Sequence, residues 1–346
     1  MFRTDLWKFS QRVGRAVVIL LATAVMSVGC GKQFDVGDTE ERSQEDENLI
    51  VVGVSQVGSE SVWRTANTAS IQDVFTRENG YLLIFDNARQ KQENQIKAIR
   101  SFISQQVDYI VFSPIEEDGW DDVLHEAKNA KIPVILMDRM VQTQDKSLFT
   151  AWIGSNFEEE GENAGRWLAD YLEEQERQEE IVNIVVLQGT EGSTSTIGRT
   201  DGFNKVASEH RNWNILEQTD GDFTTAKARE EMKRLLDTYE DIDVIVSQND
   251  DMTFGVLETL ENAGIEAGAD GDVIVISFDA VRSALEKVES GEINVDIECN
   301  PEQGPYIERV IQTLEEGGKA EKYSYVPEQI FTQDNLSREL IDERSY

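Results

Sequence analysis

The sequence predicts an α/β protein built from two doubly wound parallel sheets. Short, nearly continuous apolar runs recur along the chain, and such runs are typical of parallel strands that are covered on both faces. Amphipathic stretches of helical period separate these runs, and an alternation of strands and helices indicates a doubly wound fold. The alternation pauses near Ala151–Asn156 and then restarts, which favours two similar halves over one long sheet.

The predicted elements follow one another from Leu49 onward. Strands are expected at Leu49–Ser55, Tyr81–Asp86, Tyr109–Ser113, Val134–Asp138, Val182–Gln188, Val244–Ser247 and Val273–Asp279. Helices are expected at Trp63–Arg77, Glu93–Gln105, Trp120–Asn129, Glu158–Glu174, Arg199–Glu209, Thr224–Thr238 and Met252–Ala263. Thr224 suits an N-cap and Gly264 suits a C-terminal stop, so these two boundaries are supported by capping chemistry.

Residues 1–29 are predicted to be an export signal. An apolar run from Ala16 to Val28 follows a start that contains Arg3, Lys8, Arg12 and Arg15. A basic start, an apolar core of ~7–15 residues and small residues at the cut are typical of such signals. The run is too short to span a bilayer, which needs ~20 apolar residues.

Cys30 follows Ser27-Val28-Gly29, a pattern that resembles the bacterial lipoprotein box. The resemblance implies that the signal is cut before Cys30 and that its thiol carries lipid, although Ser27 stands where leucine is usual. The alternative is an ordinary signal peptide with an incidental cysteine. Residues 30–48 are rich in Asp and Glu and poor in apolar residues, which predicts a solvated acidic tether.

Composition excludes several classes of function. The 346 residues contain 32 basic and 67 acidic side chains, a net charge of −35, whereas nucleic-acid binding needs clustered Lys and Arg. A lipidated Cys30 would leave Cys299 without a disulfide partner. His125 and His210 cannot build an ordinary zinc site with one cysteine. We therefore expect no metal, no cofactor and no nucleic acid.

Polar and charged side chains gather just after the predicted strands, where ligands bind in open parallel sheets. The residues at these places are Gln56, Ser59, Glu60, Arg64, Asp86, Asn87, Arg89, Asp138, Arg139, Arg199, Asn249, Asp250, Asp251 and Asp279. Carboxylates accept hydrogen bonds, guanidinium groups donate them and amides do both, so the set suits a neutral polyhydroxylated ligand. An Asp or Asn at a strand end could instead cap the next helix. Trp63 either stacks on a sugar face or packs in the core.

Enzyme functions are less well supported. The loop Gly189–Ser195 could cradle a phosphate, but it lacks the P-loop ending and the spacing of a dinucleotide fingerprint. No Gly-x-Ser-x-Gly elbow is present. A carboxylate pair for glycoside cleavage remains an alternative, because such a pair is recognised by the distance between its two carboxyl groups, which a sequence does not give. Arginines beside the acids would keep them ionised, which suits hydrogen bonding better than acid catalysis.

Several stretches resemble the periplasmic sugar-binding proteins of ABC importers, of the ribose and galactose type, and above all their galactofuranose-binding members. The stretches are Val51–Ser61 with Trp63-Arg64, Gln90–Ala98, Asp138-Arg139, Gln188–Thr190 and Asn249–Met252. The resemblance covers nearly everything from Val51 onward. It implies a type I periplasmic binding protein, in which two doubly wound lobes are joined by a hinge.

The same resemblance implies the lobes and their site. Lobe one would hold residues 49–153 and 301–324, and lobe two residues 154–300 and 325–346, with crossings near Ile153–Asn156, Glu298–Pro301 and Tyr325–Glu328. It implies that Glu60, Arg64, Asp138 and Arg139 hold a sugar from lobe one and that Arg199, Asn249 and Asp279 hold it from lobe two. Whether Glu298 adds a contact is left open.

The resulting expectation is a lipid-anchored, extracytoplasmic sugar-binding protein, monomeric and not an enzyme. It would bind a monosaccharide such as galactofuranose by hinge closure and present it to an ABC permease, at the outer face of the cytoplasmic membrane or in the periplasm. The alternative is a binding protein that presents the sugar to a membrane receptor or histidine kinase. A sugar hydrolase is a third option, and the export signal disfavours a related DNA-binding repressor.

Overall fold

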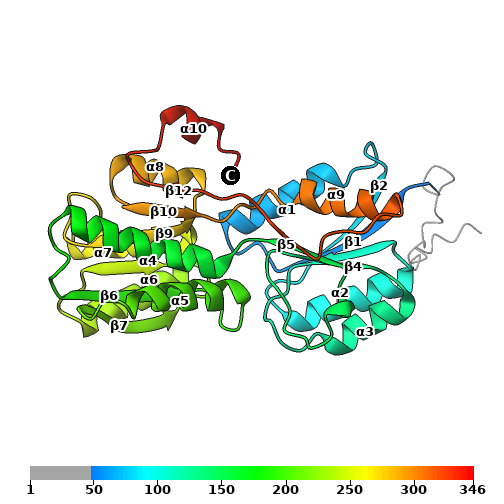
Figure 1. The fold of residues 1–346 in the computed structure, drawn as a ribbon, viewed down its shortest axis with the longest axis horizontal. Coiled ribbons are helices and arrows are strands. Elements are labelled where there is room, and N and C mark those ends of the chain that lie inside the picture. Colours follow the sequence, from blue (N-terminus) through cyan, green and yellow to red (C-terminus); the bar gives the residue numbers. More distant parts are fainter. Residues whose placement is uncertain (1–47) are drawn as a thin grey trace, which may run out of the picture. The chain divides into compact units, whose positions relative to one another are not determined.

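The computed structural model describes residues 48–346, so the predicted signal peptide, Cys30 and nearly all of the acidic tether lie outside the described residues. Two six-stranded sheets organise the described chain, and helices cover both faces of each sheet (Figure 1). The predicted fold class, two doubly wound lobes, is therefore confirmed. Within residues 48–346, no helix combines the length and the hydropathy needed to cross a bilayer.

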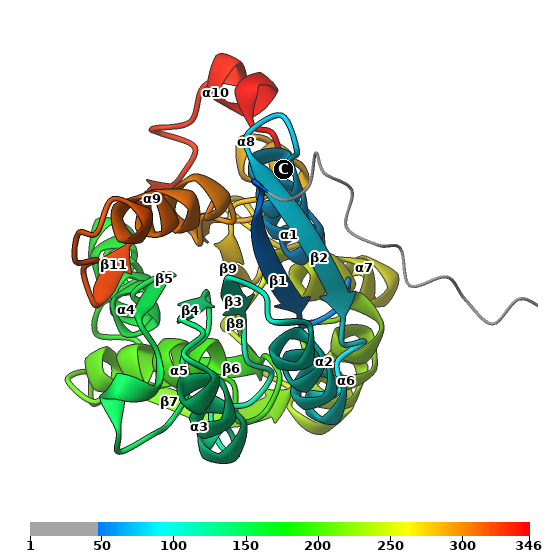
Figure 2. The same cartoon turned by 90° about the vertical axis from the view of Figure 1, so that its right-hand side faces the viewer.

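The first sheet has the strand order β11-β5-β4-β3-β1-β2, and all its pairs are parallel. Its strands are β1 (Ile50–Gln56), β2 (Tyr81–Asn87), β3 (Tyr109–Phe112), β4 (Val134–Met137), β5 (Ala151–Gly154) and β11 (Tyr323–Tyr325). Four helices cover it, namely α1 (Val62–Val74), α2 (Gln92–Gln105), α3 (Asp121–Ala130) and α9 (Gly304–Glu315), with a short 3₁₀ turn at Lys146–Leu148. Figure 2 shows α9 and α1 on one side of this sheet and α2 and α3 on the other.

The second sheet has the order β12-β10-β9-β8-β6-β7 and is parallel except for the edge strand β12, which runs antiparallel to β10. Its strands are β6 (Val182–Gln188), β7 (Trp213–Asp220), β8 (Val244–Ser247), β9 (Ile274–Asp279), β10 (Val295–Glu298) and β12 (Ile330–Phe331). Its helices are α4 (Phe157–Glu174), α5 (Thr194–Ala207), α6 (Thr225–Thr238), α7 (Asp250–Ala263), α8 (Arg282–Ser290) and α10 (Arg338–Glu343).

The continuous apolar runs are explained by cores on both faces of each sheet. In β3, Ile110 and Phe112 join the core under α2 and α3, whereas Tyr109 and Val111 join the core under α1 and α9. Because successive strand residues point to opposite faces, a strand that is covered on both sides needs an apolar residue at every position.

Three segments cross between the sheets, and they are bonded to one another. Ser155 lies in the crossing after β5, Cys299 and Asn300 follow β10, and Glu328 lies between β11 and β12. Glu328 Oε1 accepts hydrogen bonds from the Ser155 hydroxyl and from the Asn300 backbone N–H, the latter at 3.0 Å. The three crossings therefore form one hydrogen-bonded bundle.

Elements with weaker sequence patterns were not predicted. These are the strands β5, β7, β10, β11 and β12 and the helices α8, α9 and α10. The apparent pause at Ala151–Asn156 contains β5, a four-residue strand next to the edge of its sheet. Tyr325, which the resemblance assigned to lobe two, pairs with Gly154 in the first sheet.

Candidate functional site

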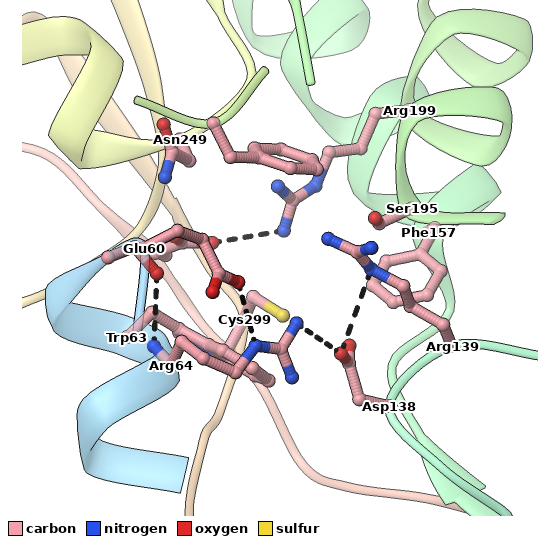
Figure 3. A pocket seen from close by; sticks show the side chains of 13 residues that line it. Glu60, Trp63, Arg64, Asp138, Arg139, Phe157, Ser195, Arg199, Asn249 and Cys299 are labelled. Carbon is pink, nitrogen blue, oxygen red and sulfur yellow. Dashed lines mark hydrogen bonds and ion pairs between the residues drawn. The ribbon is translucent and has the colours of Figure 1, made fainter. Parts of the chain in front are cut away.

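A polar cavity lies where the carboxyl ends of the two sets of strands meet. The lining residues are Glu60, Ser61, Trp63, Arg64, Asp138, Arg139, Phe157, Ser195, Arg199, Phe223, Asn249, Asp279 and Cys299. The structure therefore brings all seven residues of the predicted set to one cavity (Figure 3).

Arg64 organises the half of the cavity that the first sheet supplies. It lies in the first turn of α1, where the side chain of Ser61 caps the helix by accepting from its backbone N–H at 3.0 Å. Its guanidinium contacts Glu60 at 3.0 Å, Asp138 at 2.7 Å and Gln56 at 3.2 Å. Burial lowers the pKa of Arg64, but the Asp138 and Glu60 charges together raise it above the usual value.

Asp138 reaches the cavity because the backbone turns sharply there. Its φ of 57° ends β4 one residue earlier than the sequence predicted and directs the carboxylate towards Arg64. The turn is supported at both ends, since the Asp138 N–H donates to the Ile153 carbonyl at 2.7 Å and its carbonyl accepts from the Trp152 indole at 3.0 Å. Ser113 donates a further hydrogen bond to the carboxylate at 2.9 Å.

Arg139 is buried beside this cluster, and its guanidinium Nε lies 4.0 Å from Asp138 Oδ2, an ion pair that is too long for a hydrogen bond. One amino group donates to the Ile115 carbonyl at 3.0 Å, and the guanidinium lies 5.4 Å from the centre of the Phe223 ring. Burial, and then the neighbouring charge of Arg64, lower the pKa of Arg139 to about 10. The side chain is therefore cationic at neutral pH.

Arg199 has the corresponding role in the half that the second sheet supplies. Its guanidinium contacts Glu160 at 2.6 Å and Asp279 at 3.1 Å, and it also donates to the Gln248 carbonyl. Burial raises the pKa of both acids, and Arg199 opposes that rise. Since Arg199 ties together α4, β8 and β9, it joins the ligand-facing surface to the core of its lobe.

Asn249 divides its amide between the fold and the cavity. The side-chain oxygen caps α7 by accepting from the Met252 N–H at 2.9 Å. Its nitrogen points towards the cavity (Figure 3). The capping role that the sequence offered as an alternative and the ligand-facing role are therefore compatible.

Three buried polar atoms around this site have no hydrogen-bond partner among the described residues. They are Glu60 Oε2, Arg139 Nε and Glu160 Oε1. Buried polar groups are nearly always paired in folded proteins. Glu60 offers an acceptor and Arg139 offers a donor, so the missing partner is a group that both donates and accepts, as a hydroxyl does.

Aromatic side chains form the apolar part of the wall. The Trp63 indole donates to the Cys299 carbonyl at 2.6 Å, and the Arg64 guanidinium lies 4.6 Å from the centre of its ring. Phe223 packs so closely on Gly189 that a Cβ there would lie 1.9 Å from the ring. The glycine is therefore explained by packing, and its N–H donates to Gln248 at 3.0 Å, which leaves that N–H unavailable to a phosphate.

Three further residues of the cavity wall, Phe157, Phe223 and Cys299, were not predicted, for a common reason. Each follows the end of β5, β7 or β10, strands that were themselves missed. Glu298, which had been left open, does not line the cavity. Its carboxylate binds Arg344, the Tyr346 hydroxyl at 2.9 Å and the Gln329 N–H at 2.9 Å.

One acidic cluster lies behind the cavity, at the crossing segments. The side-chain atoms of Glu160, Cys299 and Glu328 that could bind a metal ion, two carboxylate oxygens and one sulfur, all lie within 4.8 Å of one another. Burial raises the pKa of Glu328 to about 9 and raises the pKa of the Cys299 thiol as well. With Arg199 already bonded to Glu160, this cluster is better suited to holding protons than a metal ion.

The two halves also bond directly to each other around the cavity. The Val62 N–H donates to Asp251 at 2.9 Å, the Met140 N–H donates to the Thr194 hydroxyl at 2.9 Å, and the Glu117 N–H donates to the Gly192 carbonyl at 2.9 Å. Each bond joins a residue packed on the first sheet to one packed on the second. The structure is therefore that of the closed arrangement of the lobes.

Two α/β lobes that are joined by three crossing segments and enclose a polar cavity define a two-lobed solute-binding protein. The comparison with protein families agrees: the family model described as "Periplasmic binding protein domain" matches residues 52–319. The chain belongs to this family, which confirms the prediction of a binding protein rather than an enzyme.

Relatives of known ligand are similar over most of the chain. The galactofuranose-binding protein YtfQ of Escherichia coli (strain K12) is 35% identical over 295 residues, which is 84% of this chain and 90% of the relative. A Mycobacterium smegmatis protein solved in complex with β-D-fucofuranose is 41% identical, with a TM-score of 0.79, and the match covers 83% of this chain and 92% of that one. The arabinose transporter binding protein of Shewanella sp. ANA-3, solved with α- and β-L-arabinofuranose, is 37% identical with a TM-score of 0.79, over 85% of this chain and 95% of that one.

Proposed function

We propose that this protein is the extracytoplasmic substrate-binding component of a sugar ABC importer and that its lobes close around one furanose monosaccharide. The observation that carries the proposal is that Glu60 Oε2 and Arg139 Nε, which belong to two side chains of the cavity wall, have no hydrogen-bond partner among the described residues. A sugar that offers several hydroxyl groups supplies donors and acceptors to both lobes at once.

The ligand would hold the lobes closed through its differential affinity. Glu60, Arg64, Asp138 and Arg139 act from the first lobe, and Arg199, Asn249 and Asp279 act from the second. Only a molecule that contacts both sets stabilises the closed arrangement over the open one. Periplasmic binding proteins close around their ligands by rotation of the two lobes about a hinge of this kind.

The furanose ring form is supported by the relatives. Those solved with fucofuranose and arabinofuranose are 41% and 37% identical, and the E. coli relative is named for galactofuranose. The cavity wall combines aromatic rings with charged groups, the two kinds of contact that a sugar ring uses.

A titration with sugars that form furanoses tests the proposal. Calorimetry of the wild-type protein with D-galactose, D-fucose and L-arabinose is expected to give one-to-one binding for at least one sugar. With that sugar labelled with ¹³C at C1, the bound NMR spectrum is expected to show a furanose anomeric carbon. A bound pyranose would overturn the ring form, and no binding of any monosaccharide would overturn the function.

Asp138→Ala is expected to abolish most of this binding. The substitution removes the 2.7 Å partner of Arg64 and leaves a buried guanidinium under-bonded, at a cost of ~1–3 kcal/mol or more, which weakens binding by about tenfold to a hundredfold. Asp121→Ala, an exposed change in the same lobe, is the control. Equal affinity of the two variants in calorimetry would remove Asp138 from the site.

We infer lipid anchoring at Cys30 from the sequence alone, since residues 1–47 lie outside the described structure. The expected result of Cys30→Ser is transfer of the protein from the membrane fraction to the soluble extracytoplasmic fraction. Immunoblots of separated fractions measure it, with Cys299→Ser as the matched control. Unchanged membrane association of the Cys30 variant would contradict the anchor.

A further inference from the structure

Asp279 and Ala280 adopt a backbone conformation that L-residues rarely take. Their φ angles are 107° and 57°, at the point where β9 ends. The turn directs the Asp279 carboxylate to Arg199 at 3.1 Å, on the wall of the cavity. A conformation of this kind costs free energy and persists only where the surroundings fix it.

Two buried acids hold this turn in place. Asp296, in β10, accepts a hydrogen bond from the Ala280 N–H at 3.1 Å. Asp250, the first residue of α7, accepts from the Val281 N–H at 2.8 Å and from the Ser277 hydroxyl at 2.5 Å. Both carboxyl groups are fully buried. The two N–H groups that follow Asp279 are therefore each held by a carboxyl oxygen.

The two acids are also close neighbours, and together they need a proton. Their carboxyl groups hold consecutive backbone N–H groups, those of Ala280 and Val281, and Asp296 Oδ2 has no donor among the described residues. Two adjacent buried carboxylates cannot both be charged without strong repulsion. One proton on Asp250 removes the repulsion and gives Asp296 Oδ2 its donor.

No neighbouring cation neutralises the pair in place of that proton. Burial raises the pKa of Asp250 well above its usual range, and Asp296 raises it further. Burial also raises the pKa of Asp296; the hydrogen bond with Asp250 and the charge of Arg344 oppose this rise, and the charge of Asp279 adds to it. Arg199, the other nearby cation, is already bonded to Glu160 and Asp279.

We propose that Asp250 and Asp296 form a proton-sharing pair that positions Asp279, and through it Arg199, for ligand binding. The inference rests on the proposed function, because Asp279 matters here as a ligand-facing residue. Asp250 directly follows Asn249, so the pair sets two of the ligand-facing side chains of its lobe. Neither acid lines the cavity, which makes both of them positioning residues.

Conservative and truncating variants of Asp296 test the pair. Asp296→Asn keeps an acceptor for the Ala280 N–H, and its amide donates to Asp250 without a shared proton, so affinity is expected to stay within about threefold of wild type. Asp296→Ala removes both bonds and is expected to weaken binding about tenfold or more, the scale of a lost hydrogen bond to a charged group. Calorimetry with D-galactose, D-fucose and L-arabinose measures both, and Asp270→Asn, an exposed acid in the same lobe, is the control.

A double-mutant cycle separates positioning from general damage to the lobe. If Asp296 acts through Asp279, Asp296→Ala weakens binding much less in an Asp279→Asn background than in wild type. An equal loss in both backgrounds, or wild-type affinity of Asp296→Ala, would overturn the pair while leaving the sugar site intact. A wild-type protein that binds no sugar would instead refute the proposed function.

A spectroscopic measurement covers the case in which Asp296→Ala does not fold. The infrared difference spectrum of wild type minus Asp296→Asn at neutral pH is expected to show the band of a protonated carboxyl group, since Asp250 loses its reason to hold a proton in the variant. A difference spectrum without that band would overturn the shared proton.

Discussion

Arg199→Ala is expected to abolish sugar binding and to lower the free energy of unfolding by about 3–5 kcal/mol, the range for removing one partner of a buried ion pair. The guanidinium contacts Glu160 at 2.6 Å and Asp279 at 3.1 Å, and both acids are almost completely buried. Without it, two raised-pKa carboxyl groups face each other across an empty space. They must then take up protons, which removes the Asp279 carboxylate as an acceptor for the sugar.

Calorimetry and urea unfolding measure the two losses separately. Arg199→Lys is expected to fall between wild type and the alanine variant, because one ammonium group cannot bond both carboxylates and the Gln248 carbonyl in the same geometry. Arg229→Ala, which removes an exposed ion pair with Glu258, is the matched control and should change unfolding by at most about 1 kcal/mol. Wild-type affinity in Arg199→Ala would refute the proposed site.

Part of the ligand-facing set could be predicted because parallel strands place their carboxyl ends at one edge. Asp138, Asn249 and Asp279 each follow a strongly apolar run, but so do Asp86 and Asn87, which do not line the cavity, and it was the family resemblance that separated the two groups. Phe157 and Phe223 could not be found in this way. The strand before Phe157, β5, is only four residues long, and the strand before Phe223, β7, is an edge strand with a mixed pattern.

The ion pairs inside the site could not be predicted from the sequence either. Glu160 stands in the run Glu158-Glu159-Glu160, and nothing in that run distinguishes the buried acid from its two exposed neighbours. Its burial depends on which face of α4 meets α5, which is decided by tertiary packing. The glycines of these two helices could not be interpreted from the sequence for the same reason. Glycine has a low helix propensity, so the sequence suggests only that these residues weaken the helices, whereas the structure shows that they let the helices pack closely.

Gly202→Ala is expected to destabilise the protein, although alanine normally favours a helix over glycine by about 1 kcal/mol. At the crossing of α4 and α5, a Cβ on Gly202 would lie 2.0 Å from the Glu158 carbonyl oxygen, and a Cβ on Gly161 would lie 2.2 Å from the Arg199 carbonyl oxygen. Both obstacles are backbone atoms, so the helices have to separate. Overpacking of this kind costs about 1–3 kcal/mol, and the separation also moves Arg199 away from Glu160.

Asp201, the residue before Gly202, provides a control that separates the effect of packing from the effect of helix propensity. Asp201 is exposed on the same helix, so Asp201→Ala changes helix propensity in the same direction without touching α4. Urea unfolding is expected to show a lower midpoint for Gly202→Ala and an unchanged or higher one for Asp201→Ala, with weaker sugar binding only in the former. Equal or greater stability of Gly202→Ala would mean that the two helices can part without cost, and that the Arg199 cluster does not depend on their close approach.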